Sequence, residues 1–388
     1  MKALNQLKTF QRILNDYPAE TPLSKFLAAF YRQNKQMGST DRKVASRLIY
    51  NYFRLGSALP GLPADERLVV AEFLCNTQSN SFLQHFKPEW ALCASFGIDE
   101  KLKLVKTAYP AFDLDDVFPW TKELSAGIDK NAFLRSFFTQ PDLYIRVRRG
   151  SEQQVKIQLG KAGIAFKDEG SNCLALPNGT RVDSVLQPAL YEVQDHSSQQ
   201  TAQYFRPHSG EAWWDACAAS GGKSLLLHEQ QPDIKLVVSD IRESILANLD
   251  ERFRNAGLNR YQKKLLDLTQ NPDPVLHDYA FDGIILDAPC SGSGTWGRTP
   301  EMISQFDGGK IAFFQRLQQN IARNVVKYLK PGKPLIYITC SVFRVENEDA
   351  VEFMTKELSL KLEESKVLKG YERRADTMFV ARLSPPTP

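Results

Sequence analysis

Residues 212–229 read AWWDACAASGGKSLLLHE, and the order of residue types in this stretch decides the class of fold. A short apolar run of strand length, residues 212–217, precedes a helix-like segment, residues 224–229. The loop Cys217-Ala218-Ala219-Ser220-Gly221-Gly222-Lys223 joins them with small residues that let a ligand approach the backbone, and the amino terminus of the next helix attracts negative groups. It matches neither a Walker loop nor a GxGxxG motif, so nucleotide phosphates are not the obvious ligand. A tight strand-to-helix turn without a ligand explains the same residues.

The alternation of strand and helix continues along the chain from this unit. Further strands are expected at residues 235–240, 263–268, 283–287 and 334–339. Apolar residues at helical spacing mark one helix face at Ile241, Ile245, Leu249 and Phe253, and a later helix stops at Lys330-Pro331-Gly332. This pattern predicts an α/β domain over residues 204–388, with a mostly parallel sheet covered on both faces. Ligands of such sheets bind at the carboxyl ends of the strands.

Two acidic residues lie at those expected strand ends. Asp240 follows the glycine loop by about 20 residues, the interval at which a carboxylate can accept hydrogen bonds from ribose hydroxyls. The same side chain can instead cap the helix that starts at Ile241. Asp267 ends the next strand, where a carboxylate can reach an adenine amino group. Together with the loop, these residues favour a nucleoside-containing cofactor.

Two cysteines lie at the ends of two further strands. Cys290 follows Asp287 in Leu286-Asp-Ala-Pro-Cys-Ser-Gly-Ser-Gly294, and Cys340 lies in Tyr337-Ile-Thr-Cys-Ser341. We expect these strands to be neighbours in the sheet, which would bring both thiols to the mouth of the cofactor crevice. A single buried cysteine is more often an inert part of a core. A thiolate at this place is a nucleophile suited to addition at an electron-poor ring carbon.

Residues 136–203 read as a small α+β module. Leu143, Ile145 and Val147 alternate with polar residues, which predicts a strand with one basic face. A helix is expected at 152–162, and further strands at 164–166, 173–176 and 190–193. The basic side chains at the first of these strands are Arg146, Arg148 and Arg149.

Residues 1–135 read as helices, with apolar residues at helical spacing in 23–30 and 44–53. Residues 1–60 carry ten Lys/Arg against three Asp/Glu, a net charge of +7, so the other residues sum to −3 within the net charge of +4. A basic segment on a nearly neutral body suits contact with a polyanion. An ordinary solvated helix face explains the same charges.

Composition excludes several classes of protein. Apolar residues make up 43% and charged residues 24% of the 388 residues, which argues against wholesale disorder and fibrous architecture. The opening residues lack the apolar run of a signal peptide, and no segment offers about 18 uninterrupted apolar residues, so we expect neither secretion nor a membrane span. The six cysteines show no paired zinc spacing, which predicts free thiols in a reducing cytoplasm and no metal site.

The motifs around these cysteines resemble those of the RsmB/NSUN family of RNA (cytosine-5) methyltransferases, which use S-adenosylmethionine (AdoMet). The family carries D-x-C-A-A-P-G-G-K, D-A-P-C-S-G-x-G and T-C-S segments, the last followed by E-N-E. This chain has the corresponding segments in the same order, with Glu346-Asn347-Glu348 after Thr-Cys-Ser and Val193-Gln-Asp-His-Ser-Ser-Gln199 ahead of the loop. The resemblance covers about residues 140–383, and residues 1–135 are similar, more weakly, to the NusB-like domain of some bacterial members. Ser220 departs from the usual proline, and Asp376-Thr-Met-Phe379 from the usual glycine and aromatics.

The resemblance implies a Rossmann-like methyltransferase domain and a role for each site residue. Cys340 is then the nucleophile that adds to carbon 6 of a cytosine, Cys290 assists release of the product, and Asp287 supplies a proton near N3 or lines the cofactor site. Residues 217–223, Asp240 and Asp267 hold AdoMet. Arg298, just after the Cys290 segment, is a phosphate or base contact, or a simple surface arginine.

The implied substrate is RNA whose target base is unstacked or extruded, with ribosomal RNA ahead of transfer RNA. Arg146, Arg148 and Arg149 of the small α+β module are then expected to contact the RNA backbone. A non-catalytic RNA-binding or ribosome-assembly factor that keeps the fold is the alternative from another class, and the presence of both cysteines argues against it. A DNA methyltransferase is disfavoured because the Thr-Cys segment is present and no separate DNA target-recognition region is visible. A redox role for the cysteine pair is the weakest reading, since the chain has no C-x-x-C.

Overall fold

The computed structural model describes residues 2–387 and divides into two compact units. The first, called here the helical unit, contains the chain up to Lys122 with Asp129–Gln140 and Thr295–Asp307. The second, the sheet unit, contains Glu123–Ile128, Pro141–Gly294 and the chain from Gly308 onward. The sequence predicts three domains, with boundaries after residues 135 and 203. That division stays a prediction.

The helical unit is built from short helices around an aromatic and aliphatic core. Phe10, Leu27, Leu48 and Phe82 are among the residues fully or almost fully buried in it. Buried Arg54 donates hydrogen bonds to the carbonyl of Phe137 at 2.9 Å and to Gln140. The helices are α1 (Lys2–Asp16), α2 (Leu23–Gln33), α3 (Ser39–Arg54), α4 (Ala64–Cys75), α5 (Ser81–Phe86), α6 (Pro88–Leu92), α7 (Ile98–Ala108), α8 (Lys130–Ser136) and α14 (Glu301–Gln305).

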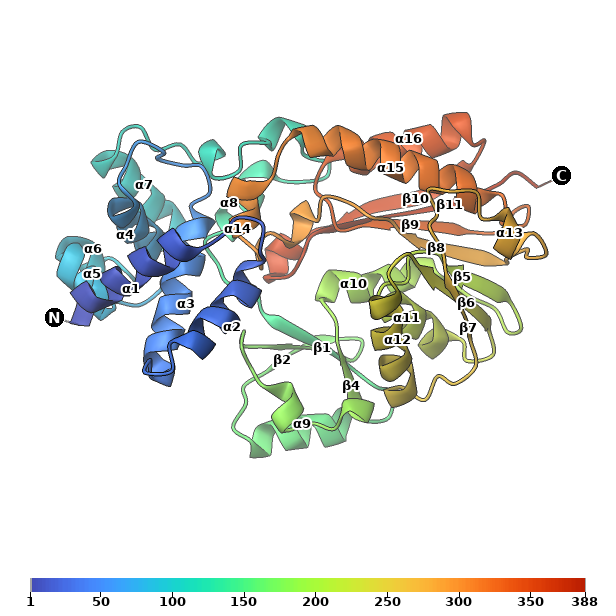
Figure 1. The fold of residues 1–388 in the computed structure, drawn as a ribbon, viewed down its shortest axis with the longest axis horizontal. Coiled ribbons are helices and arrows are strands. Elements are labelled where there is room, and N and C mark those ends of the chain that lie inside the picture. The colour runs from blue at the N-terminus through green and yellow to red at the C-terminus, as the bar shows by residue number, and fades with distance from the viewer. Residues whose placement is uncertain (1, 388) are drawn as a thin grey trace. The chain divides into compact units, whose positions relative to one another are not determined.

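The sheet unit begins with a four-stranded antiparallel sheet in the order β2-β3-β1-β4, backed by helix α9 (Glu152–Lys161) (Figure 1). Its strands are β1 (Leu143–Val147), β2 (Lys167–Gly170), β3 (Cys173–Leu176) and β4 (Tyr191–Val193). The strand expected at 164–166 is wrong, because Ile164 and Phe166 pack on the core of this sheet from a loop. The edge strand that follows is instead made of polar residues.

The main sheet has seven strands in the order β10-β11-β9-β8-β5-β6-β7. Neighbours from β9 to β7 are parallel, whereas β11 and β10 complete the sheet as antiparallel strands. The strand order reverses between β5 and β8, which is where doubly wound sheets open a ligand crevice. The strands are β5 (Ala212–Asp215), β6 (Lys235–Asp240), β7 (Gln262–Leu265), β8 (Gly283–Asp287), β9 (Leu335–Thr339), β10 (Lys361–Leu368) and β11 (Met378–Ser384).

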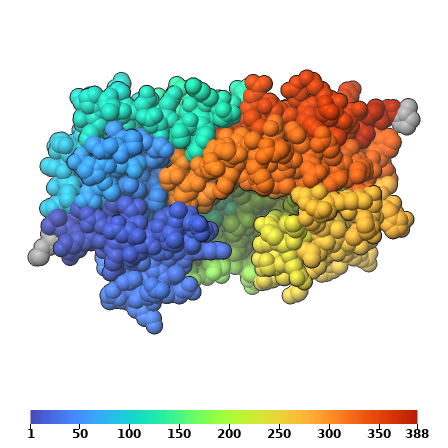
Figure 2. All heavy atoms as spheres, turned by 45° about the horizontal axis from the view of Figure 1, so that its top comes forward, coloured from blue at the N-terminus to red at the C-terminus, as the bar shows by residue number. Residues whose placement is uncertain are grey.

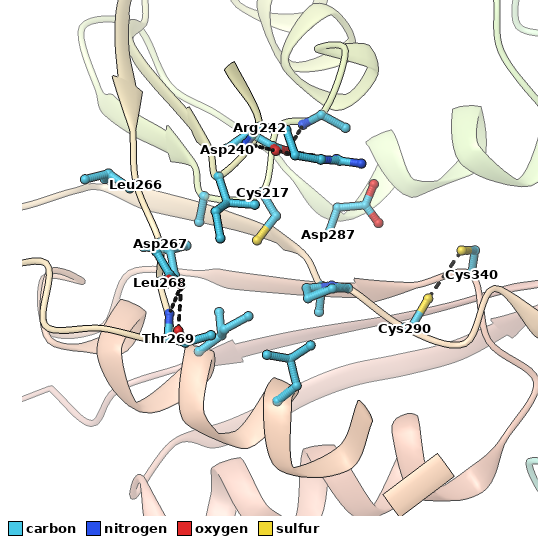
Figure 3. A pocket seen from close by; sticks show the side chains of 17 residues that line it. Cys217, Asp240, Arg242, Leu266, Asp267, Leu268, Thr269, Asp287, Cys290 and Cys340 are labelled. Atoms are coloured by element: carbon cyan, nitrogen blue, oxygen red, sulfur yellow. Dashed lines mark hydrogen bonds and ion pairs between the residues drawn. The ribbon is translucent and has the colours of Figure 1, made fainter. Parts of the chain in front are cut away.

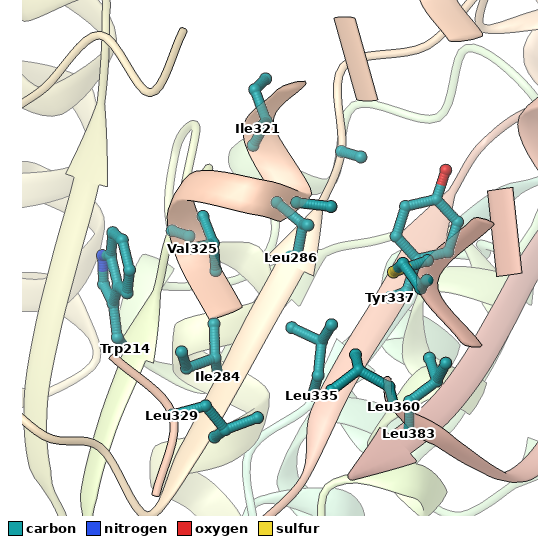
Figure 4. Packing of buried hydrophobic residues seen from close by; sticks show 14 of the residues in the cluster. Trp214, Ile284, Leu286, Ile321, Val325, Leu329, Leu335, Tyr337, Leu360 and Leu383 are labelled. Atoms are coloured by element: carbon teal, nitrogen blue, oxygen red, sulfur yellow. The ribbon is translucent and has the colours of Figure 1, made fainter. Parts of the chain in front are cut away.

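Helices cover both faces of this sheet, as the sequence predicts for an α/β fold (Figure 1). On one face, Ile321 and Val325 pack against Trp214, Ile284 and Leu286 (Figure 4). In Figure 2 the side chains of α15 and α16, in orange and red, form the outer layer over that face. The helices of the unit are α10 (His196–Gln200), α11 (Gly222–Gln230), α12 (Glu243–Asn255), α13 (Asp273–Leu276), α15 (Gly309–Val326) and α16 (Glu348–Glu357).

One expected helix position differs from the structure. Ile241 does not belong to the buried face of α12, because the helix begins two residues later and the Ile241 side chain is 58% exposed. Among residues 2–387 no helix combines the length and the apolar character needed to cross a lipid bilayer.

Candidate active site

A cavity of about 570 Å³ opens at the carboxyl ends of the parallel strands (Figure 3). The segments singled out in the sequence meet here: the small-residue loop after β5, the acids after β6 and β7, and both cysteines. Its size lies within the range of small-molecule sites in proteins. Its lining residues are Ala216, Cys217, Ala219, Asp240, Ile241, Arg242, Leu266, Asp267, Leu268, Thr269, Asp287, Ala288, Pro289, Cys290, Leu317, Ile321 and Cys340.

The loop after β5 turns sharply into α11. Ala219 and Gly221 adopt left-handed conformations, with φ of 46° and 82°. A side chain at Gly221 would place its Cβ 2.3 Å from the ring of Phe253, so only glycine fits there without displacing α12. The Ala218 amide donates to the carbonyl of Ser239 at 2.8 Å, which ties the loop to the end of β6. The loop therefore presents its backbone to the cavity in a fixed path.

Asp240 ends β6, as the sequence predicts, and is 6% exposed. It accepts hydrogen bonds from the Ala219 amide at 3.0 Å and from the guanidinium of Arg242 at 3.0 and 3.1 Å. Burial acts to raise the pKa of Asp240, but the hydrogen bonds from Arg242 outweigh it and hold the pKa below its ordinary value. The carboxylate is thus ionised and ready to accept hydrogen bonds from ligand hydroxyls. Both of its oxygens are engaged by Arg242 in this structure (Figure 3).

Asp267 also borders the cavity, but two residues beyond the end of β7. It is exposed, and one of its oxygens accepts hydrogen bonds from the amide of Thr269 at 2.9 Å and from its hydroxyl at 2.6 Å. The side chain is therefore oriented by its own turn, while Leu266 and Leu268 on either side of it are buried. An apolar wall beside a carboxylate suits an adenine ring.

Asp287 ends β8 and pairs with Lys223, whose Nζ lies 3.1 Å from Asp287 Oδ2. Lys223 is 7% exposed and also donates to the hydroxyl of Ser198 at 2.8 Å. The last residue of the loop thus contacts the acid at the end of β8. It brings a buried positive charge to the edge of the cavity that also contains the cysteines.

Cys290 and Cys340 lie side by side, with their sulfur atoms 3.3 Å apart (Figure 3). The expectation that their strands are neighbours is confirmed, since β8 and β9 pair in parallel with Asp287 opposite Ile338. The hydrogen bond with Cys340, together with burial, raises the pKa of the Cys290 thiol well above its ordinary value. Cys290 therefore keeps its proton near neutral pH and can donate it to the Cys340 sulfur.

A buried carboxylate holds the two cysteine segments together. Glu346 is fully buried and accepts hydrogen bonds from the Ser291 amide at 2.8 Å, the Ser341 hydroxyl at 2.8 Å and Gln318 at 3.1 Å. Ser291 follows Cys290 and Ser341 follows Cys340, so one side chain fixes both thiol-bearing turns. Burial raises the pKa of Glu346 despite these donors.

Gly294 brings the same two segments into close contact. Its amide donates to the carbonyl of Cys340 at 2.8 Å, and its carbonyl accepts from the Thr377 amide at 2.9 Å. A Cβ at this position would lie 1.9 Å from the Thr377 carbonyl oxygen. Glycine is required here by close backbone approach.

The arginines expected to contact RNA occupy different environments. Arg146 and Arg148 do not form an open basic face: Arg146 is 4% exposed, and both guanidinium groups are paired with Glu229, and that of Arg148 also with Glu192. The reason is that both faces of β1 are covered, which a single strand pattern does not reveal. Arg149 is exposed, and Arg298 is partly exposed in the helical unit. Contact of any of the four with RNA stays a prediction.

Sequence reasoning missed two carboxylates. Asp215, at the end of β5, is fully buried, accepts a hydrogen bond from the Ser224 hydroxyl at 2.6 Å, and has a pKa raised to about 7 by burial. The role of Glu346 in joining the cysteine turns was missed as well. Both residues lie inside the quoted motifs, so the motifs pointed to them, but only the fold shows what they contact. Residues 2–387 bring together no group of three or more His, Cys, Asp or Glu side chains able to hold a metal ion.

Residues 202–387 match the family model described as 16S rRNA methyltransferase RsmB/F. Over these residues the chain is similar to the RsmB/F methyltransferase family. The resemblance carried by the loop and by the two cysteine segments is thereby confirmed over these residues.

Relatives of the RsmB type match a longer part of the chain. A ribosomal RNA small subunit methyltransferase B from Proteus mirabilis is 32% identical over 223 residues, which cover 55% of this chain and 51% of the relative. The protein of the same name from Shewanella oneidensis is 29% identical over 68% of this chain and 58% of its own length. The chain thus spans little more than half the length of the relatives that it matches.

Solved structures show the same fold. NSun6 from Pyrococcus horikoshii superposes with a TM-score of 0.59 at 18% identity, over 70% of this chain and 97% of NSun6. A methyltransferase homologue from the same organism gives 0.58 at 21% identity, over 74% of this chain and 98% of that chain. The Rossmann-like methyltransferase fold expected from the RsmB/NSUN motifs is confirmed.

Proposed function

We propose that this protein is an AdoMet-dependent RNA (cytosine-5) methyltransferase that acts on ribosomal RNA. The observation that carries the proposal is the pair of thiols, 3.3 Å apart, at the mouth of the cavity formed by the family's motifs. The relatives named ribosomal RNA small subunit methyltransferase B support ribosomal RNA as the substrate.

The residues around the cavity fit AdoMet. Ionised Asp240 is a hydrogen-bond acceptor for ribose hydroxyls, and Leu266, Leu268 and Ile321 offer an apolar surface to the adenine. The backbone of residues 217–223 lies where the amino-acid part would bind, and Cys217 lines the same wall. Burial raises the pKa of Cys217, so it stays a neutral thiol rather than a competing nucleophile. Bound AdoMet supplies an electrophilic methyl group.

In the proposed mechanism, Cys340 activates the base. Carbon 5 of cytosine is a weak nucleophile because the ring is aromatic and electron-poor. Addition of the Cys340 thiolate to carbon 6 breaks the aromaticity and gives carbon 5 the character of an enamine, so that it accepts the methyl group. Asp287 is the proposed acid near N3, and the proton that it passes to the ring can come from the Lys223 ammonium, whose Nζ lies 3.1 Å from it.

Release needs loss of the carbon-5 proton and cleavage of the bond between Cys340 and carbon 6. Cys290 is the proposed helper in this step. Because its pKa is raised, it carries a proton that it can give to the departing Cys340 sulfur 3.3 Å away. The Cys290 thiolate left by this transfer is the proposed acceptor of the carbon-5 proton, so both cysteines end the step as thiols. Glu346 keeps the two sulfur atoms at this separation through Ser291 and Ser341.

The test is a trapping assay with AdoMet and unmodified ribosomal RNA. Wild type, Cys290→Ala and Cys340→Ala are compared for methyl transfer and for a covalent protein–RNA band on a denaturing gel, with Cys93→Ala in the helical unit as the matched control. We expect a stable adduct with Cys290→Ala, and neither adduct nor methylation with Cys340→Ala.

The outcomes separate the alternatives. Methylation by Cys340→Ala would show that the nucleophile is wrongly assigned. Methylation of transfer RNA but not of ribosomal RNA would keep the chemistry and change the substrate. If wild type binds RNA but methylates neither, the chain is a binding or ribosome-assembly factor that keeps the fold.

A further inference from the structure

Ser220 occupies the turn of the loop between two residues with left-handed backbones, Ala219 and Gly221. The family's usual residue at this position is proline, whose ring fixes φ near −65° and so restrains the turn covalently. Serine gives no such restraint, and each unrestrained residue adds conformational entropy that ligand binding must remove. The loop of this chain therefore needs another device to hold it.

Arg252 of α12 supplies contacts at this point. Its Nη1 donates to the carbonyl oxygen of Ser220 at 3.0 Å and also to the Ser220 hydroxyl. The two contacts grip the backbone and the side chain of one residue, which fixes its orientation more firmly than either alone. Arg252 is about one-quarter exposed, so water competes with these bonds only in part.

Arg252 is itself held from the antiparallel sheet. Its Nε and Nη2 donate to one oxygen of Glu192 at 3.1 and 2.7 Å, and Glu192, in β4, is 7% exposed. The other Glu192 oxygen accepts from Arg148. A charged pair with a buried carboxylate orients a guanidinium strongly, because moving it would leave a buried charge without a partner.

A second residue of the loop, Gly222, is also held by a side chain next to the antiparallel sheet. Gln194, just after β4, donates to the carbonyl of Gly222 at 3.3 Å and accepts from Arg146 Nε at 2.9 Å. The carbonyls of Ser220 and Gly222, two residues apart in the loop, are thus bound by side chains that depend on the antiparallel sheet. This gives Arg146 and Arg148 a structural role in their buried positions.

We infer that Arg252 is a positioning residue for AdoMet: held by Glu192, its guanidinium fixes Ser220 and thereby keeps the loop 217–223 in its binding conformation in place of the missing proline. The inference rests on the proposed function. It makes Arg252 act through the loop, without contact with the reacting atoms.

The test measures AdoMet affinity of the full-length protein by isothermal titration calorimetry, alongside hydrogen exchange of the loop amides without ligand. Arg252→Gln should weaken AdoMet binding about tenfold, since charged hydrogen bonds are lost, and should speed exchange at residues 219–222. At saturating AdoMet, kcat should change less than twofold, so the effect falls on KM. Ser220→Ala removes only the hydroxyl contact and should give a smaller loss of affinity. Because it leaves Arg252 in place, it tests the same contact even if Arg252→Gln fails to fold.

The decisive variant is Ser220→Pro combined with Arg252→Gln. Proline restores the covalent restraint, so the double variant should regain most of the affinity that Arg252→Gln loses. The matched control is Arg254→Gln, an exposed arginine on the same helix, which should bind AdoMet like wild type.

Three results would overturn the inference: wild-type affinity of Arg252→Gln, an equal loss in Arg254→Gln, or no recovery in the double variant. If wild type itself does not bind AdoMet, the proposed function fails together with this inference. If wild type binds and methylates but Arg252→Gln binds equally well, only the inference fails.

Discussion

At the scale of single residues, Asp215 makes stability depend on pH. Burial raises its folded-state pKa to about 7, whereas an unfolded aspartate titrates near 4. The folded state therefore holds a proton that the unfolded state loses, and the stability contributed by the protonated group falls as pH rises from about 4 to about 7. Asp215→Asn, which stays neutral and can still accept from Ser224, should be more stable than wild type at pH 8 by roughly 1–4 kcal/mol, and little different at pH 4.

Thermal unfolding of both proteins at pH 4, 6 and 8 checks this expectation. Asp233→Asn, at an exposed aspartate ahead of β6, is the matched control and should show no such trend. A difference between Asp215→Asn and wild type that is the same at all three pH values would show that folding does not raise the pKa of Asp215.

Arg242 should compete with the cofactor. It is 57% exposed, and its guanidinium engages both oxygens of Asp240, the acceptor proposed for the ribose hydroxyls. An exposed ion pair contributes up to about 1 kcal/mol, so Arg242→Ala should tighten AdoMet binding about threefold by releasing the carboxylate. Isothermal titration calorimetry measures the AdoMet affinity of each variant. Asp240→Asn, which removes the carboxylate itself, should lose most of the binding. Weaker binding by Arg242→Ala would mean that the arginine itself contacts the cofactor.

Residue types and spacing could reveal the chemistry but not the surroundings of each side chain. Cys290 and Cys340 are visible in the sequence because both follow buried strands that pair in parallel, and the fold places their sulfur atoms in contact. Arg146 looks like part of a basic face in the sequence, since alternation cannot tell a solvent face from one covered by α11. The pairing of Arg252 with Glu192 spans 60 residues, and no local pattern predicts it.

At the scale of elements, the close contact between the turn after β8 and the turn after β9 depends on Gly294. Gly294→Ala should force the Thr377 carbonyl and the Cys340 segment apart, because its Cβ would lie 1.9 Å from the Thr377 oxygen. Overpacking of this kind costs about 2 kcal/mol or more, and the displaced Cys340 should cut methyl transfer more than tenfold. Thermal unfolding and methyl transfer are measured together. The control is Gly61→Ala, where an added Cβ would meet no atom within 4 Å; equal behaviour of the two variants would contradict the prediction.

Glu346 ties the same two turns together by hydrogen bonds. Glu346→Ala leaves donors of the Ser291 amide and of Gln318 without their acceptor in a buried place, which should cost about 3 kcal/mol. Combined with Cys290→Ala, the background in which the RNA adduct accumulates, it should abolish trapping. The exposed Glu352 on α16 provides the control, Glu352→Ala, which should unfold like wild type and, in the same background, should leave trapping unchanged. An alanine variant at 346 that unfolds like wild type and still traps RNA would rule out this role.

The strands of the parallel sheet could be predicted, and the added edge could not. Residues 235–240 and 283–287 are apolar runs with the same bounds in sequence and structure, because a strand buried on both faces reads as a continuous hydrophobic segment. β10 is mostly exposed, with the sequence KLEESKVL, so it carries little of that signal and forms through pairing with β11. Ile241 fits a helical period, but it precedes α12 and lines the cavity with an exposed side chain.

At the scale of the whole molecule, charge and chemistry are separated along the chain. The basic first 60 residues belong to the helical unit, while the thiols and the cofactor loop belong to the sheet unit. Seven of the ten Lys/Arg in that segment are exposed, whereas Arg54 is buried and Arg42 and Arg47 are partly buried. These exposed charges, rather than Arg146 and Arg148, are the better candidates for RNA backbone contacts.

Reversing exposed charges of the helical unit should therefore weaken RNA binding in a salt-dependent way. Each phosphate contact that is lost lowers the slope of log K against log salt concentration by about 1, so Lys8→Glu, Lys25→Glu and Arg32→Glu together should reduce the slope by about 3. Filter binding at several salt concentrations measures this slope. The AdoMet affinity should stay unchanged, because the three residues lie outside the sheet unit. Lys310→Glu, Lys327→Glu and Lys356→Glu change the net charge equally from exposed positions on or beside α15 and α16. An equal loss of slope in that control would mean that net charge alone attracts the RNA, and that the basic segment has no contact of its own.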